Sequence, residues 1–325
     1  MTARASRPKV VVVGAGLAGL TAARELMSRD VDVIVFDKGR GVGGRLATRR
    51  IDTSAGTAIF DHGAQFFTAR SDAFRSMVAD WQRDDVVYEW CRGFGDTDGH
   101  PRYAVQGGMA ALTKHLAREL DVRTSTLVFS VSHGDTDRWI VTLDDGSTHP
   151  ADGVILTCPI PQSYSLVANT SIELPNDLLM TDYERTLGVL AVLDRPSAVP
   201  DPGGLQNPDG VFSWVGDNRR KGVSPLPALT LHANPTWSLE HWDAPHDDAH
   251  AALLDAAREY IGDAEVIESQ FKRWRFATPM KVWPDAHWRE DSGTLVLAGD
   301  AFAGPKVEGA VTSGLSAAQS LAFWV

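Results

Sequence analysis

The sequence predicts an α/β protein, and two observations near the start of the 325-residue chain carry that prediction. A short apolar strand at residues 10–13 runs directly into three glycines that are spaced as GxGxxG. A helical pattern of apolar residues follows, and residues 31–35 then alternate as a second strand that ends at Asp37. A strand, a glycine turn, a helix and an acidic residue in this order are typical of a Rossmann-type dinucleotide-binding unit.

Each of the three positions in this turn requires glycine for a different steric reason. Gly14 allows the tight turn, Gly16 lets the backbone approach a pyrophosphate, and Gly19 lets the helix lie close to the strand. The helix N-terminus offers free N–H groups to the anion, and Asp37 is placed to accept hydrogen bonds from the adenosine ribose. We expect cofactor contacts in this unit at Gly14, Ala15, Gly16, Ala18, Gly19, Asp37 and Lys38.

A second glycine signal, RGVGGR at residues 40–45, favours FAD over NAD. A nicotinamide-binding fold needs no paired glycines just after its second strand, whereas an extended flavin cofactor passes close to this loop. Gly44 permits that approach, and Arg45 can supply a positive charge near the phosphates. The alternative interpretation is a glycine-rich surface turn.

Composition narrows the class of protein. Hydrophobic residues make up 43% of the chain and charged residues 22%, which is typical of a soluble globular protein, and no apolar run reaches the length of a membrane span. The formal net charge of −11 disfavours nucleic-acid binding, although a local arginine cluster could still hold one small anion. Only two cysteines occur and no signal peptide is predicted, so we expect a cytoplasmic protein.

The nucleotide-binding features are scattered along the chain, which predicts a discontinuous domain. We assign residues 1–70, 103–162 and 292–325 to the FAD-binding domain. Residues 71–102 and 163–291 are assigned to a second, α+β substrate domain with a mixed or antiparallel sheet. Further helices are expected at residues 71–81, 112–120 and 249–261, and further strands at 122–131, 139–143, 153–157 and 294–298.

The last predicted helix opens at Glu308, shortly after Gly299 and Asp300. One face of this helix consists of small residues and one leucine: Ala310, Gly314, Ala317, Ala318 and Leu321. A face this small lets the helix lie very close to another element. The helix N-terminus would then point at the ligand, which in a flavoprotein is the N1–C2=O edge of the ring.

Taken together, these motifs resemble the FAD-dependent amine oxidase superfamily and, within it, the renalase-like oxidoreductases. The resemblance covers essentially the whole chain and rests on residues 14–23, 40–45, 60–70, 105–117, 232–238, 273–277 and 297–318. The segments DHGAQFFTAR at 61–70 and RWRFA at 273–277 are the more specific ones. The resemblance implies a discontinuous, GR2-like FAD-binding domain.

The resemblance also implies roles for individual residues. Gly14, Gly16 and Asp37 would bind the ADP half of FAD, and Val128 would contact adenine through its backbone. Arg45 would lie near the pyrophosphate. The other implied contacts are Gly299 and Asp300 at the ribityl chain, Glu308, Gly309 and Ala310 at the ring N1–C2=O edge, and Ala64, Gln65 and Phe66 along the reactive edge.

Two departures from the superfamily pattern matter for function. The covalent flavin link of monoamine oxidases needs a cysteine just before the last helix, and residues 307–310 contain none, so the FAD should be bound non-covalently. The lysine that many amine oxidases place near flavin N5 has no secure counterpart. Lys281 is the nearest candidate, which puts classical amine oxidation in doubt.

His232 and Trp274 are the candidate substrate-facing catalytic residues. Lys272, Arg273 and Arg275 alternate around Trp274 on a predicted strand. The pattern is consistent with a solvated edge strand, or with a cationic wall and an aromatic platform for a planar anionic substrate.

Two other histidine patterns point away from catalysis. We expect His62 to fix its loop by a hydrogen bond. His246 and His250 have metal-ligand spacing but lack the glutamate of an HExxH motif. The aspartates beside His246 are typical of the acidic first turn of a helix, so no metal site is expected.

The sequence therefore predicts an FAD-dependent oxidoreductase in which a small-molecule substrate gives hydride to flavin N5 and O2 accepts the electrons. Resemblance to the renalase-like enzymes implies that the substrate is a non-productive dihydro isomer of NAD(P), which is returned to the oxidised β form. The alternatives are oxidation of an amine, desaturation of an apolar molecule, or a non-catalytic scaffold like the Rab-escort-type proteins. No nucleic-acid or membrane partner is expected.

Overall fold

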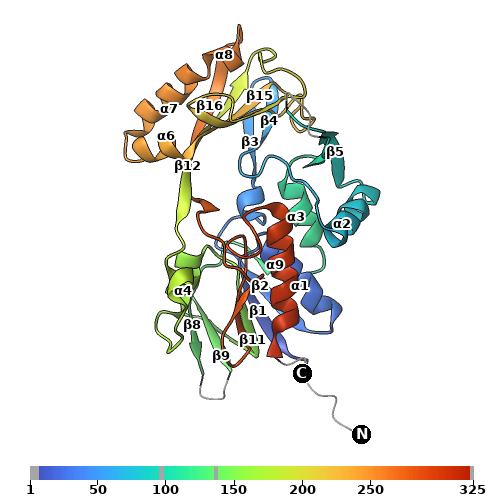
Figure 1. The fold of residues 1–325 in the computed structure, drawn as a ribbon, viewed down its shortest axis with the longest axis vertical. Helices are drawn as coiled ribbons and strands as arrows, with labels where there is room; N and C mark the ends of the chain where they lie inside the picture. Colours follow the sequence, from blue (N-terminus) through green and yellow to red (C-terminus); the bar gives the residue numbers. More distant parts are fainter. Residues whose placement is uncertain (1–6, 95–98, 135–137, 323–325) are drawn as a thin grey trace. The chain divides into compact units, whose positions relative to one another are not determined.

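The computed structural model describes residues 7–94, 99–134 and 138–322, and the chain forms two compact units (Figure 1). Unit 1 comprises Met1–Gly44, Thr113–Asp182 and Pro279–Val325, and unit 2 comprises Arg45–Leu112 and Tyr183–Thr278. Among the described residues, no helix combines the length and the apolar character that crossing a membrane requires.

A six-stranded sheet with the order β17-β18-β11-β1-β2-β7 forms the centre of unit 1. Its strands are β17 Trp288–Arg289, β18 Leu295–Leu297, β11 Gly153–Leu156, β1 Lys9–Val13, β2 Asp32–Phe36 and β7 Asp121–Arg123. All neighbours pair in parallel except β17, which runs antiparallel to β18. The four valines of β1 are buried, as the strands of a covered parallel sheet require. The predicted Rossmann-type unit is confirmed.

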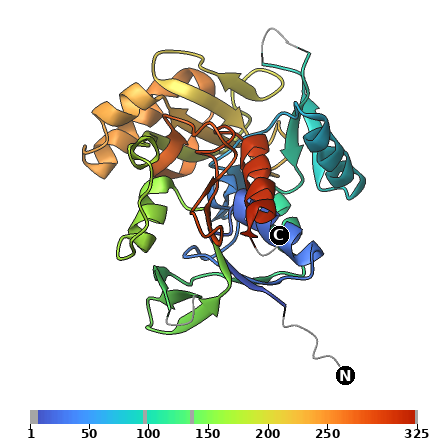
Figure 2. The ribbon, with the colours of Figure 1, turned by 60° about the horizontal axis from the view of Figure 1, so that its bottom comes forward.

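Two helices lie side by side in unit 1, α1 Leu17–Ser28 and α9 Val307–Ser320 (Figures 1 and 2). A Cβ atom added at Gly314 would lie 2.3 Å from the carbonyl oxygen of Ala18, so this contact requires glycine. Gly314, Ala317 and Ala318 are buried on that face. The close packing predicted from the small residues of the last helix is confirmed.

The single strand predicted at 122–131 is wrong. The chain divides there into β7, which pairs with β2, and β8 Val128–His133, which joins β9 Trp139–Leu143 and β10 Thr148–Ala151 in a separate antiparallel sheet. Ser125 has a positive φ of 53°, and its N–H donates to the carbonyl of Gly39. This turn holds the chain against the loop after β2 and ends the first strand.

Two short helices, α4 Ile160–Val167 and α5 Asn176–Leu179, complete unit 1. Val167, Leu174 and Leu178 pack into the same apolar core as Phe36 and Phe302. Residues 163–182 and 279–291 therefore group with unit 1, whereas the sequence-based ranges placed them in the substrate domain.

Unit 2 is built on a five-stranded sheet with the order β13-β14-β15-β12-β16. These strands are β13 Gly204–Gln206, β14 Phe212–Asp217, β15 Ala228–Ala233, β12 Tyr183–Leu193 and β16 Val266–Pro279. Three helices accompany the sheet: α6 Pro235–Glu240, α7 His246–Ala256 and α8 Arg258–Ile261. The helix expected at 249–261 is thus two helices, because Ala257 leaves the helical backbone (φ −85°, ψ 4°) while its side chain and Tyr260 stay in the core.

Two hairpins and two helices lie outside this sheet: β3 Thr48–Thr53 with β4 Gly56–Asp61, β5 Val87–Cys91 with β6 Arg102–Val105, α2 Asp72–Arg83, and α3 Ala110–Leu116. Ile51 and Phe60 of the first hairpin pack against Leu190 and Val192 of β12. Residues 45–70 and 103–112 therefore group with unit 2, although the sequence-based ranges placed them in the FAD-binding domain.

Candidate functional site

The glycine turn of unit 1 has the geometry of a dinucleotide cradle. Gly14 has a φ of +108°, and a Cβ atom there would lie 2.5 Å from Oγ1 of Thr157. A Cβ atom at Gly19 would lie 2.0 Å from the carbonyl oxygen of Gly14, so helix and turn touch only because this residue is glycine. A Cβ atom at Gly16 would meet no protein atom within 4 Å. Protein packing therefore does not explain Gly16, whereas the approach of a ligand would.

The second glycine loop packs directly on the first. The N–H of Gly43 donates to the carbonyl of Ala15 at 2.9 Å, and a Cβ atom at Gly44 would lie 3.6 Å from Cα of Gly16. Gly44 has a positive φ of 53°. A dinucleotide held at the first turn would therefore also lie along the second loop, which fits the extended cofactor predicted from the paired glycines.

Asp37, at the end of β2, holds the turn together. Its Oδ2 accepts a hydrogen bond from the N–H of Ala15 at 2.7 Å, and its Oδ1 accepts one from the N–H of Gly39 at 2.6 Å. Each carboxylate oxygen retains a further lone pair that a ribose hydroxyl could use. Lys38 is directed elsewhere, because its Nζ donates to Oε1 of Gln162. The structural role of Asp37 was not predicted from the sequence.

The start of α9 is also glycine-dependent. A Cβ atom at Gly309 would lie 2.1 Å from the carbonyl oxygen of Gly304. The N–H of Ala310 already donates to the carbonyl of Lys306 within the helix, so Gly309 is the better placed of the two N–H groups expected at the flavin ring. Gly299, with φ +133°, and the partly buried Asp300 follow β18. Glu308 lies in the first turn of α9, where its negative charge interacts favourably with the positive end of the helix dipole.

Two further predicted cofactor residues, Val128 and Arg45, lie outside the first glycine turn. Val128 begins β8 in the small antiparallel sheet of unit 1, and its side chain is buried. Arg45 belongs to a short 3₁₀ turn, Gly44–Leu46, and its Nη1 lies 3.4 Å from the carbonyl oxygen of Ala277. The Arg45 guanidinium therefore also contacts β16.

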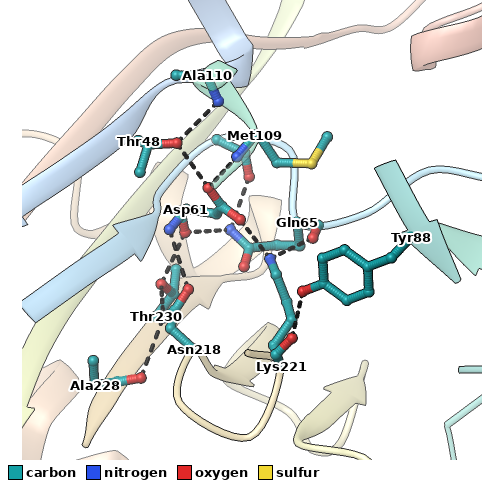
Figure 3. Close-up of polar contacts among 11 residues, drawn as sticks. Thr48, Asp61, Gln65, Tyr88, Met109, Ala110, Asn218, Lys221, Ala228 and Thr230 are labelled. Carbon is teal, nitrogen blue, oxygen red and sulfur yellow. Dashed lines mark hydrogen bonds and ion pairs between the residues drawn. The ribbon is translucent and has the colours of Figure 1, made fainter. Parts of the chain in front are cut away.

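Unit 2 contains a buried polar network around the last residue of β4, Asp61 (Figure 3). Its Oδ2 forms an ion pair of 2.6 Å with Nζ of Lys221, and both residues are almost fully buried. Its Oδ1 accepts hydrogen bonds from Oγ1 of Thr48 at 2.8 Å and from the N–H of Met109 at 2.7 Å. A buried carboxylate is stable only with such compensation.

Lys221 and Gln65 extend this network along the loop that follows β4. Nζ of Lys221 also donates to the carbonyl of Gln65 at 2.6 Å, while Nε2 of Gln65 donates to the carbonyls of Asp61 and Gly63. The hydroxyl of Tyr88 donates to the carbonyl of Lys221. Burial raises the pKa of Tyr88 to about 12, so it remains a neutral donor.

The carbonyl of His62 receives donors from both predicted catalytic residues. Nε1 of Trp274 donates to it at 3.0 Å, and Nε2 of His232 lies 3.1 Å from it. Burial lowers the pKa of His232 to about 4, so this ring is neutral at pH 7 and its Nε2 carries the proton that is donated. This geometry supports a role in holding the loop for both residues.

The side chain of His62 does not fix its loop as expected. Among the described residues, its buried Nδ1 has no hydrogen-bond partner, and it is the backbone carbonyl that is held. Burial and then the positive charge of Lys272 lower the pKa of His62 to about 4. The ring lies 5.2 Å from that of Trp274.

Of the two interpretations of the residues around Trp274, the cationic wall is wrong. Successive side chains of a strand point to opposite faces, and on β16 Arg273 and Arg275 are exposed whereas Lys272 and Trp274 lie on the partly buried face. The guanidinium of Arg273 donates to the carbonyl of Ala244. Since β16 is at the edge of its sheet, the edge-strand interpretation is confirmed.

An aromatic cluster, Phe66, Trp90, Phe94 and Trp214, was missed from the sequence. The ring of Phe66 lies 5.1 Å from that of Phe94, 5.5 Å from that of Trp214 and 6.4 Å from that of Trp90. Nζ of Lys221 lies 5.6 Å from the ring of Trp90. This cluster therefore joins Phe66, a residue expected at the flavin edge, to the buried ion pair.

Other candidates receive no support as sites. Lys281 is exposed. The rings of His246 and His250 lie 6.0 Å apart, and the described part of the chain contains no group of three side chains that could hold a metal ion.

Comparison with known proteins agrees with this fold. Residues 12–81 match the NAD(P)-binding Rossmann-like domain, and residues 81–322 match the family model for flavin containing amine oxidoreductase. Because the second match covers most of the chain, the protein belongs to the flavin-containing amine oxidoreductase family. It is therefore a flavin-dependent oxidoreductase.

Three individual proteins illustrate the similarity. Renalase from Mus musculus is 21% identical over 98% of this chain and 99% of its own length. A triple mutant of putrescine oxidase superposes with a TM-score of 0.74 at 16% identity, over 98% of this chain and 99% of that one. Cyclohexylamine oxidase from Brevibacterium oxydans has a TM-score of 0.69 at 15% identity, with the same coverage. At these identities the two solved structures establish the fold alone.

Proposed function

We propose that the protein is an oxidase that binds FAD non-covalently in the cradle of unit 1. FAD is favoured over FMN because the glycine turn and Asp37 are the features that hold an adenosine diphosphate, which FMN lacks. Residues 307–310, at the start of α9, contain no cysteine for a covalent link. The cofactor would accept a hydride at N5 and pass the electrons to O2.

The purified protein should be yellow and should release intact FAD when it is denatured with acid. The released flavin is identified by chromatography against FAD and FMN standards. A protein that stays colourless when supplied with FAD would favour the scaffold alternative, and flavin that remains on the denatured chain would contradict non-covalent binding.

Replacing Asp300 by alanine should weaken FAD binding by at least about tenfold. A carboxylate that accepts hydrogen bonds from ribityl hydroxyls contributes about 1.5–3 kcal/mol for each bond, and about 1.4 kcal/mol is a factor of ten in affinity. Titration of the apoprotein with FAD measures this loss, and Asp300→Asn, which retains one acceptor oxygen, should lose less. An unchanged affinity in Asp300→Ala would remove Asp300 from the site.

We further propose that the substrate is a dihydronicotinamide dinucleotide, namely a 2- or 6-dihydro isomer of NAD(P). The observation that carries this proposal is the match to renalase over essentially the whole length of both chains. The chemistry of unit 2 is consistent with it. The reduced ring of such an isomer has a weak C–H bond and needs no general base. Asp61, which is paired with Lys221, and His232, which donates to the His62 carbonyl, are therefore not required to accept a proton.

The proposed reaction converts one dihydro isomer, one O2 and one proton into one oxidised NAD(P) and one hydrogen peroxide. The carbon–hydrogen bond of the ring breaks, and its two electrons reduce O2. Incubation of the enzyme with purified 2- or 6-dihydro NAD should therefore yield β-NAD and peroxide in equal amounts. Peroxide without β-NAD, or no consumption of either isomer, would contradict the proposed substrate.

Oxidation of an amine remains a second candidate because of one observation. Lys221, which no sequence motif marks, is a buried lysine that contacts the carbonyl of Gln65, on the segment expected beside the flavin edge. It is a stronger candidate than Lys281 for the lysine that many amine oxidases place near N5. Comparison of reduction rates with amines and dihydronicotinamides separates the two functions.

A further inference from the structure

The loop from Asp61 to Phe66 is held by its carbonyl groups. Four of its six carbonyls accept hydrogen bonds from side chains of unit 2. The donors are Thr230 and Gln65 for the carbonyl of Asp61, Trp274 and His232 for that of His62, Gln65 for that of Gly63, and Lys221 for that of Gln65.

The N–H groups of the same loop are used differently. Those of Asp61, His62 and Ala64 donate to Asn218, Ala47 and Arg45 respectively. Within the described chain, the N–H groups of Gly63, Gln65 and Phe66 donate to no protein acceptor. Gln65 is nevertheless buried, with 7% of its surface exposed. Because buried backbone donors are nearly always paired, the N–H of Gln65 indicates a place for an acceptor from outside the chain, whereas Gly63 and Phe66 are only partly buried.

The backbone of the loop is also confined sterically. A Cβ atom at Gly63 would lie 1.9 Å from the carbonyl oxygen of Arg45, and the N–H of Ala64 donates to that same oxygen at 2.8 Å. The loop therefore keeps one conformation, with its acceptors turned to the donors of unit 2.

Lys221 is the charged group in this arrangement. Its ammonium is satisfied by the carboxylate of Asp61 and by the carbonyl of Gln65, both at 2.6 Å, so a single cation joins the first residue of the loop to the fifth. A buried ammonium needs such partners. The charge-assisted hydrogen bond from Lys221 therefore holds the carbonyl of Gln65 in this orientation. The peptide that follows Gln65 then carries the unpaired N–H of Phe66.

We propose that Lys221 is a positioning residue that fixes loop 61–66 as a preformed donor site for a hydrogen-bond acceptor, a ring nitrogen or carbonyl oxygen of the bound flavin or of the substrate. The buried N–H of Gln65 is its principal donor, and the partly exposed N–H groups of Gly63 and Phe66 lie on either side of it in the chain. This inference rests on the proposed function only for the identity of the substrate. The fixed loop is a property of unit 2.

The test uses the FAD-loaded enzyme and a double variant, Asp61→Asn with Lys221→Met, which leaves no unpaired buried charge. Ser238→Ala is the matched control, because Ser238 is also fully buried in unit 2 and holds the N–H of Leu187, far along the chain from the loop. Backbone hydrogen exchange of a peptide spanning residues 58–68 is measured first, without substrate. The double variant should exchange at least about tenfold faster in this peptide, while the β14 and β15 peptides and the control stay unchanged.

Two further readouts identify the acceptor. A shifted visible spectrum of the bound FAD in the double variant assigns the acceptor to the flavin. An unchanged spectrum, with a higher substrate concentration needed for half-maximal flavin reduction, assigns it to the substrate. Loop exchange equal to that of the control overturns the inference. If exchange rises but no dihydronicotinamide reduces even the natural protein, the proposed substrate fails and the positioning role stands.

Discussion

Replacing Lys221 by methionine is expected to lower the free energy of unfolding by about 3–5 kcal/mol. Methionine matches the length of the lysine side chain but leaves the carboxylate of Asp61 buried without its cation. Denaturant titration of the two proteins measures the difference.

The matched control is Lys114→Met, at an exposed position of α3, which should change the free energy of unfolding by less than about 0.5 kcal/mol. Adding Asp61→Asn to Lys221→Met should restore part of the loss, because it removes the unpaired charge. A Lys221→Met protein within about 1 kcal/mol of the natural one would show that the pair carries little of the stability of unit 2.

The protein should lose stability steeply as the pH falls from about 6.5 to about 4, and His232 should account for much of this loss. Burial lowers the pKa of His232 from 6.5 in the unfolded chain to about 4 in the folded one. The unfolded state therefore binds a proton first as the pH falls, which favours unfolding across this window and has no effect above it. A shift of this size corresponds to about 3 kcal/mol.

His232→Gln keeps a side-chain N–H for the carbonyl of His62 but does not titrate. Its free energy of unfolding should fall between pH 7 and pH 4 by about 3 kcal/mol less than that of the natural protein. His246→Gln replaces an exposed histidine, so its free energy of unfolding should change between pH 7 and pH 4 as that of the natural protein does. Parallel stability curves for His232→Gln and the natural protein would show that His232 is not buried in its neutral form.

The cofactor-binding half of the fold was predictable because its signals are local. Strand β1, the glycine turn and α1 follow one another within twenty or so residues. Each is marked by its own periodicity or by glycines, of which Gly14 and Gly19 leave no room for a Cβ atom. The small face of α9 was predictable for the same reason, because the close approach of this helix to Ala18 requires a glycine at position 314.

The substrate half was less predictable because its contacts join distant residues. Asp61 and Lys221 are 160 positions apart, and neither lies in a pattern that marks it as one of a buried pair. The aromatic partners of Phe66 come from two other segments of unit 2, residues 90–94 and strand β14. Arg273 and Arg275 were grouped with Trp274 because they are its neighbours in sequence, but the alternation of strand β16 separates them. Local patterns place elements, whereas tertiary pairing decides which side chains meet.

Rapid mixing without oxygen shows whether a dihydronicotinamide isomer reduces the flavin of this protein. The loss of flavin absorbance is followed after mixing with 2- and 6-dihydro NAD(P), with ordinary 4-dihydro NADH, with simple monoamines and with an apolar polyene. We expect a 2- or 6-dihydro isomer to bleach the flavin within seconds, at about 1 s⁻¹ or faster, and the other compounds to react far more slowly. Faster bleaching by a monoamine or by the polyene than by every dihydronicotinamide isomer would contradict this expectation.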